Sequence, residues 1–143
     1  MSASSSCSNG YTSLDDGINC YKLNYRSGSR ISWESAKREC EQTEFAQLLS
    51  ITDPFEQAYM RLLTYSKEVD QTWIGLYQET SNLNWKWTDS RAVTYTNWGS
   101  GVNITFNISK SECVYLDGND GKWRLASCSN SLAYMCKQSL GFL

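Results

Sequence analysis

The chain contains no histidine among its 143 residues. Histidine is the side chain that most often serves as a general acid or base near neutral pH. We also find no nucleophile beside a base and no two carboxylates placed to share a cleft. The acidic pairs Asp15–Asp16 and Glu39 with Glu41 fit a solvated turn and a solvated helix face. The sequence therefore predicts that the protein is not an enzyme.

The sequence also lacks a long apolar run and an excess of basic residues. No stretch reaches the length that crosses a bilayer, and the opening MSASSS has neither the basic start nor the apolar centre of a signal peptide. Thirteen basic residues stand against fifteen acidic ones, and they form no basic stripe. This balance argues against nucleic acid and against membrane insertion by this segment.

The cysteines and glycosylation sequons indicate an oxidising compartment. Six cysteines occur together with N-x-S/T sequons at Asn103 and Asn107, as is typical of a secreted or cell-surface glycoprotein. A chain of this length with 41% hydrophobic residues can bury one core but hardly two. We therefore expect a non-native start or linker at 1–6, one folded domain at 7–138 and a C-terminal tail at 139–143.

Residues 112–137 hold three of the six cysteines and predict three short strands. Asp117–Gly121 supplies the turn residues of a hairpin between the first two. Cys113 and Cys128 would then lie across the open end of that hairpin, while Cys136 on the last strand is left to pair upstream. Six cysteines allow 15 pairings, and their spacing alone does not choose among these.

Two helices are predicted ahead of the later strands. The first has core-facing residues at helical spacing, namely Trp33, Ala36 and Cys40. The second begins at Asp53, which can cap the helix, with Pro54 at the first helical position and Glu56 able to close a capping box. It is expected to end near Ser66. Its buried face is predicted to consist of Phe55, Ala58, Tyr59 and Leu62.

The remaining segments predict strands, which makes the fold class α+β with antiparallel sheets. A hairpin is expected after Cys7, residues 46–51 form a strand or extended link, and short β-like runs begin at Thr72. Residues 102–109 alternate strictly between apolar and polar, which predicts a strand with Asn103 and Asn107 facing water. An ordinary surface hairpin with unused sequons is the alternative.

The order of these features resembles the C-type lectin-like domain over nearly the whole chain, from Cys7 to Lys137. The residues that carry the resemblance include Trp33–Ala36, Trp73–Leu76, Trp85–Asp89, Tyr95–Trp98, Trp123 and the six cysteines. The resemblance implies two helices packed on antiparallel sheets, with a long loop region at 77–112 where the family places its binding sites. It also implies the disulfides Cys7–Cys20, Cys40–Cys136 and Cys113–Cys128, of which the first marks the long form of the domain.

Calcium-binding members of this family carry three ligand motifs that this sequence lacks. Glu-Pro-Asn or Gln-Pro-Asp follows the tryptophan equivalent to Trp98, where this chain has 99–103 with Asn103 as one surviving ligand. Ser111 replaces an acid, and Arg124 with Leu125 replaces Asn-Asp. Calcium takes about six to eight oxygen ligands. We therefore expect no calcium at the usual sugar-binding site, and no other cofactor or metal.

The resemblance thus implies an extracellular, receptor-like module that binds a protein ligand or counter-receptor without calcium. A carbohydrate-binding lectin with an atypical or metal-free site is the alternative, as is a structural or adhesive spacer of a larger surface protein. Four tryptophans at motif positions are assigned to the core: Trp73, Trp87, Trp98 and Trp123. Candidate ligand contacts are Tyr77, Trp85, Asn103, Phe106 and Arg124.

Overall fold

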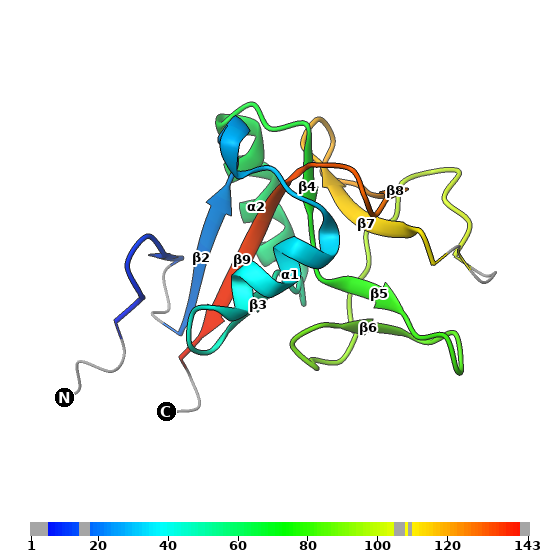
Figure 1. Cartoon of the computed structure of the whole chain (residues 1–143), viewed down its shortest axis with the longest axis horizontal. Helices are drawn as coiled ribbons and strands as arrows, with labels where there is room; N and C mark the ends of the chain where they lie inside the picture. Colours follow the sequence, from blue (N-terminus) through cyan, green and yellow to red (C-terminus); the bar gives the residue numbers. More distant parts are fainter. Residues whose placement is uncertain (1–5, 15–17, 105–107, 109, 141–143) are drawn as a thin grey trace.

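A computed structural model of the chain describes residues 6–14, 18–104, 108 and 110–140. The fold class is α+β, as predicted. None of the described helices is both long and apolar enough to cross a bilayer. The elements run in the order β1 (Thr12–Ser13), β2 (Asn19–Asn24), a short 3-10 helix (Ser27–Ser29), α1 (Trp33–Glu41), β3 (Ala46–Leu48), α2 (Pro54–Ser66), β4 (Gln71–Trp73), β5 (Leu76–Gln78), β6 (Trp85–Trp87), β7 (Glu112–Asp117), β8 (Trp123–Ser127) and β9 (Ala133–Ser139) (Figure 1).

Strand β9 is the centre of the main sheet. β2 pairs with β9 along its whole length in the antiparallel direction. β3 also pairs with β9 in the antiparallel direction, and β4 pairs with β9 in parallel. The sheet continues from β4 to β7 and β8, while β5 and β6 form a separate antiparallel ribbon. The three strands predicted in 112–137 are confirmed. β9 reaches Ser139, and the Leu140 N–H donates to the carbonyl of Ile18, so the sheet extends into 139–143.

Alternating residues of the central strands serve two cores on opposite faces of the sheet. Met135 of β9 joins the cluster that contains Met60 of α2, while Tyr134 and Cys136 join the cluster of α1. In Figure 1, α1 lies in front of β9 and α2 lies behind it. The predicted core face of α1, which consists of Trp33, Ala36 and Cys40, is confirmed.

Three disulfides link the fold with the pairing that the resemblance implied: Cys7–Cys20, Cys40–Cys136 and Cys113–Cys128. The first joins the segment before β1 to β2. The second joins α1 to β9 and spans 96 residues of sequence. The third closes the β7–β8 hairpin at its open end. The N-terminal segment, the first helix and the β7–β8 hairpin are therefore held covalently as well as by packing.

The predicted buried face of α2 is wrong. Phe55 is 61% exposed and Leu62 is 66% exposed, Ala58 is exposed too, and Tyr59 is only partly buried. The helix buries a different set, namely Glu56, Gln57, Met60 and Thr64. The polar members of this set have partners in the core: Glu56 pairs with Lys137, and Gln57 accepts a hydrogen bond from the Trp123 indole. These partners turn the polar side of the helix inward.

The start of α2 follows the prediction except in one hydrogen bond. Asp53 Oδ1 accepts from the Glu56 N–H at 2.8 Å, and Pro54 occupies the first turn. Glu56 Oε1 reaches back to the Thr52 N–H at 2.9 Å, one residue before the position that a capping box uses. The helix ends at Ser66, as expected.

The run from Trp73 to Tyr77 divides between the two sheets. It leaves β4 at Trp73 and enters β5 at Leu76, and the chain turns at Ile74 and Gly75. A Cβ on Gly75 would lie 2.9 Å from the carbonyl oxygen of Leu48, so the close approach of these backbones requires glycine. This turn carries the β5–β6 ribbon away from the main sheet.

The described part of residues 102–109 does not form the predicted strand. Val102, Asn103, Ile104 and Ile108 have irregular backbone, and Gly101 before them adopts a φ of 85°. The alternation of exposure survives, because Asn103 is exposed between two partly buried neighbours. The Ile108 N–H donates to the Gln78 side chain rather than to a neighbouring strand. Phe106 and Asn107 lie outside the described residues.

Candidate functional site

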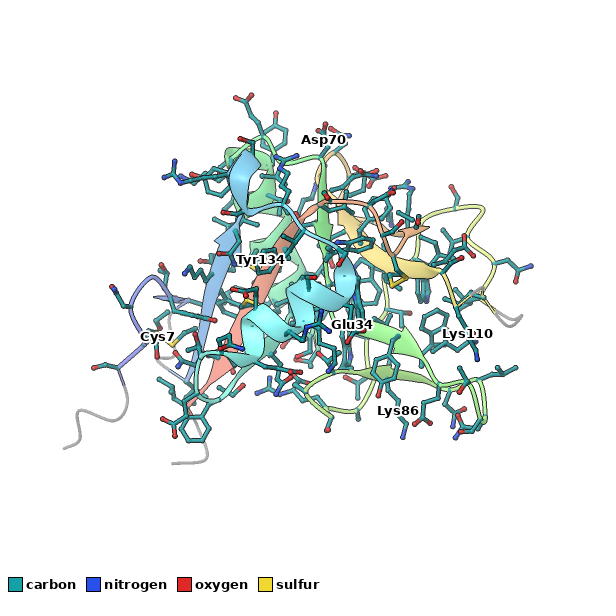
Figure 2. The ribbon with its side chains drawn as sticks, in the orientation of Figure 1. Cys7, Glu34, Asp70, Lys86, Lys110 and Tyr134 are labelled. Atoms are coloured by element: carbon teal, nitrogen blue, oxygen red, sulfur yellow. A yellow bond between two sulfur atoms is a disulfide. The ribbon has the colours of Figure 1, made fainter. Side chains whose placement is uncertain are left out.

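A cleft of about 300 Å³ lies between the first turn of α1, strand β5 and the start of β7, and we name it the α1–β5 cleft. Leu76 and Val114 belong to its apolar floor. Its wall and rim include Trp33, Glu34, Tyr77, Gln78, Lys110 and Glu112. Figure 2 shows Glu34 on α1 and Lys110 just ahead of β7 (Figure 2). The cleft therefore opens at the edge of the predicted long loop region.

The wall that α1 contributes is fixed in place. Ser32 caps the helix, since its Oγ accepts from the Ser35 N–H. The Trp33 indole N–H donates to the carbonyl of Ile74 at 2.9 Å, which ties α1 to the turn before β5. With that polar atom satisfied, Trp33 presents only its apolar ring surface to the cleft.

Tyr77 and Trp85, both predicted as ligand contacts, lie on opposite faces of the β5–β6 ribbon. Tyr77 is opposite Lys86, and Gln78 is opposite Trp85. Opposed residues share a face of the ribbon and successive residues alternate between faces, so the side chains of Tyr77 and Trp85 are on different faces. Tyr77 is half-buried and lines the cleft. Of this pair, only Tyr77 lines it.

Trp85 instead packs against the core. Its ring centroid lies 4.9 Å from that of Trp98, and it faces the same side as the buried Trp87. Trp73, Trp87 and Trp123 are fully buried, as predicted for core positions, whereas Trp98 is partly buried. The shared face of Trp85 and Trp87 follows from their two-residue spacing, a signal already present in the sequence.

Arg124, another predicted contact, is held by two carboxylates, which are Asp117 at the end of β7 and Asp120 in the turn that follows. Its Nη1 lies 2.9 Å from Asp117 Oδ2, and its Nη2 lies 2.8 Å from Asp120 Oδ2. A further bond joins Nη1 to Asp120 Oδ1 at 3.0 Å, so the contact with Asp120 is bidentate. The guanidinium hydrogen bond and the N–H of Lys122 lower the pKa of Asp120 to about 2. We call Arg124, Asp117 and Asp120 the Arg124 cluster.

The segment after Trp98 makes room for the Arg124 cluster. A Cβ on Gly99 would lie 2.9 Å from Arg124 Nε, and the Gly99 N–H donates to the carbonyl of Trp123. A second cation lies near the cluster, because the charge of Lys122 contributes to the lowered pKa of Asp120, and Lys122 Nζ donates to Asn97 Oδ1 at 3.3 Å. Arg124 thus stands at a sequence position where the resemblance sets a calcium ligand, and its charge is directed at Asp117 and Asp120.

Asn103, a predicted contact, and Ser111, which replaces an acid of the calcium motif, add no carboxylate to the Arg124 cluster. Asn103 and Ser111 are both exposed, and the Ser111 carbonyl accepts from the Cys128 N–H. Within the part of the chain that the structure describes, no three or more His, Cys, Asp or Glu side chains group as a metal site would need. The sequence did not single out Glu34, Lys110 or Glu112, because the cleft joins segments that are distant in sequence.

These features define a disulfide-linked α+β module with a cleft beside its long loop. The family model described as the lectin C-type domain matches residues 29–138, and the chain belongs to this family. It is 31% identical over 137 residues, or 95% of its length, to mouse lymphocyte antigen 75. It is 38% identical over 122 residues, or 83% of its length, to human C-type mannose receptor 2. The chain spans 8% of the length of each of these receptors.

Solved structures confirm the fold. Human lithostathine superposes with a TM-score of 0.80 at 27% identity, covering 96% of this chain and 93% of that one. The C-type lectin CEL-I from Cucumaria echinata superposes with a TM-score of 0.78 at 26% identity, covering 94% and 98%. A calcium-independent type II antifreeze protein shares the fold at 24% identity, with a TM-score of 0.75 over 93% and 94%.

Proposed function

We propose that this domain is an extracellular module that binds a protein ligand without calcium. The Arg124 cluster carries the proposal, because Arg124 stands at a position where calcium-binding relatives supply a ligand, and its guanidinium is already paired with Asp117 and Asp120. A divalent cation would have to displace this bidentate pair and approach Lys122 as well. Asn103 and Ser111 offer far fewer oxygens than the about six to eight that calcium takes.

The α1–β5 cleft supports a protein as the ligand. Its volume of about 300 Å³ lies at the lower end of small-molecule sites and suits one large side chain of a partner. Its floor is apolar, whereas metal-free recognition of a sugar needs many polar groups directed at hydroxyls. Glu34 and Glu112 stand against Lys110 at the rim, and this acidic excess favours a ligand with a positive charge beside its apolar anchor.

The calcium part of the proposal is tested by thermal unfolding. A site bound at 100 times its dissociation constant would add about 2.7 kcal/mol, which raises the melting temperature by about 5 °C or more for a domain of this size. We expect the same melting temperature in millimolar calcium and in EDTA. A rise in calcium that EDTA reverses would refute the calcium-independent site.

The ligand class is tested by binding of the labelled domain to cultured cells. We expect binding that persists in EDTA and after enzymatic removal of cell-surface glycans, and that protease treatment abolishes. Tyr77→Ser should weaken this binding, whereas Phe45→Ser, at an apolar residue that is exposed elsewhere, should not. Binding lost with the glycans would favour a metal-free carbohydrate site, and no binding to any cell would favour a spacer role.

A further inference from the structure

The outward face of α2 is apolar along its whole length. Four residues form it, and we name them the α2 stripe: Phe55, Ala58, Leu62 and Tyr65. The three large members are 61%, 66% and 68% exposed. The outward positions of α1 are, by contrast, all charged: Glu34, Arg38, Glu39 and Glu41. Contact with water therefore accounts for the charged outer face of α1 but not for the apolar outer face of α2.

The spacing of the α2 stripe is that of a helix-packing seam. Its members follow at intervals of three, four and three residues, which are the a and d positions of a heptad. Arg61 is the single charged residue among the exposed positions of α2. Such a seam fits another helix with the same kind of face.

A second copy of this chain presents the complementary face when the two helices run antiparallel. In an antiparallel seam a positions meet d positions. Phe55 then meets Tyr65 of the partner subunit, and Ala58 meets Leu62 of the partner subunit. A small residue therefore lies opposite a large one, and aromatic rings lie opposite each other. A two-fold axis repeats both pairs, as an isologous interface requires.

Charges at the two ends of α2 also favour the antiparallel arrangement. Asp53 at the start of α2 comes to lie opposite Lys67 of the partner subunit, so opposite charges meet at both ends. A parallel seam would set like charges together, and it would leave a gap between two copies of Ala58. We infer that the α2 stripe is a self-complementary interface through which two copies of this chain associate antiparallel.

The area of the α2 stripe sets the strength of this association. A fully buried aromatic side chain covers about 150 to 250 Å², so the exposed parts of Phe55 and Tyr65, with Leu62, give on the order of 300 to 450 Å² per copy. The total lies below the roughly 1,000 Å² of a stable interface. We therefore expect a reversible dimer with a dissociation constant in the high-micromolar range.

Sedimentation equilibrium of the whole chain from low-micromolar to millimolar concentration tests the interface. We expect a monomer–dimer equilibrium whose dissociation constant rises about ten-fold or more in Leu62→Ser, because both copies lose a buried leucine. Phe45→Ser is the matched control and should leave the constant unchanged. Melting temperatures should stay near that of the wild type for both variants, since Leu62 is 66% exposed and Phe45 is 48% exposed.

An exchange of sizes tests the antiparallel register. Ala58→Leu alone should weaken the dimer, because two leucines then compete for one position. Combining Ala58→Leu with Leu62→Ala sets small against large again and should restore the dissociation constant. A stronger dimer in Ala58→Leu would overturn the register. A chain that stays monomeric at millimolar concentration would overturn the interface itself. So would a dimer whose dissociation constant is unchanged in Leu62→Ser. Either result would leave the α2 stripe as a surface for a different protein.

Discussion

A buried ion pair between α2 and β9 provides the sharpest test of how this core is held together. Lys137 Nζ lies 2.7 Å from Glu56 Oε2, and the two side chains are only 1% and 7% exposed. The ammonium also donates to the carbonyl and hydroxyl of Ser50. The Tyr21 hydroxyl donates to Glu56 Oε2 at 2.6 Å. Both charges are thus paired and hydrogen-bonded, as buried charges need to be.

Glu56→Gln removes the negative charge at nearly constant volume and leaves the ammonium of Lys137 buried without its counter-charge. Breaking such a pair from one side costs about 3 to 5 kcal/mol. We expect a loss of this size in the free energy of unfolding by urea at pH 7 with the disulfides intact. Lys137→Met in the same background should recover part of the loss, because a double replacement removes the unpaired charge as well.

The same pair predicts how stability depends on pH. Burial alone would raise the pKa of Glu56, but the charge of Lys137 and its hydrogen bond, with those from Tyr21 and Thr52, outweigh burial and lower that pKa. The folded pKa therefore lies below the unfolded value of about 4.3. The stabilisation is present above that value and is lost as the pH falls through the folded pKa. Glu56→Gln should lack this component of the acid-induced loss.

Two results would contradict this account of the ion pair. One is a loss below about 1 kcal/mol in Glu56→Gln, which would mean that the charge of Lys137 is well solvated. The other is a double variant whose loss equals the sum of the two single losses, because residues in direct contact must couple.

Two further variants test the disulfide and turn arguments. Replacing Cys40 and Cys136 together by alanine should lower the free energy of unfolding by about 4 to 5 kcal/mol in the chain-entropy model, which urea unfolding would measure. Gly118→Ala should cost about 1 to 3 kcal/mol or more in the same assay, because a Cβ there meets the carbonyl of Val69. A loss of a few tenths in either case would contradict the corresponding argument.

Local chemistry explains why much of the fold was predictable. The helix start at Asp53 and Pro54, and the turn at 117–121, depend on groups within a few residues of one another. The disulfide pairing came from the resemblance, since cysteine spacing alone left 15 choices. The strand expected at 102–109 failed because alternation describes side chains, whereas a strand also needs a ladder of backbone hydrogen bonds to a neighbouring strand. The Val102 N–H instead donates to the carbonyl of Gly99, and the described residues there belong to no strand.

The candidate site was predictable only in part, for a related reason. Tyr77 was selected from the long loop region and does line the α1–β5 cleft. Glu34 and Glu112 were not selected, because they reach the cleft from α1 and β7, which only the tertiary fold brings together. Arg124 was selected as a contact for a ligand, but its guanidinium contacts Asp117 and Asp120 of its own hairpin. Counting motif positions cannot reveal such internal pairing.

The orientation of α2 about its own axis explains both the polar residues in the core and the exposed α2 stripe. At about 100° per residue, the mean direction of the inward residues Glu56, Gln57, Met60 and Thr64 lies about 165° from that of the stripe. Burying one set therefore exposes the other. Apolar periodicity alone favours the stripe inward, at about 1.5 to 3 kcal/mol for each large side chain. The partners of Glu56 and Gln57 on β9 and β8 reverse that choice, because an unpaired Lys137 or Trp123 indole would remain in the core. Pairing the polar core residues therefore leaves the apolar α2 stripe exposed, which costs free energy. A second helix that covers the stripe can offset this cost.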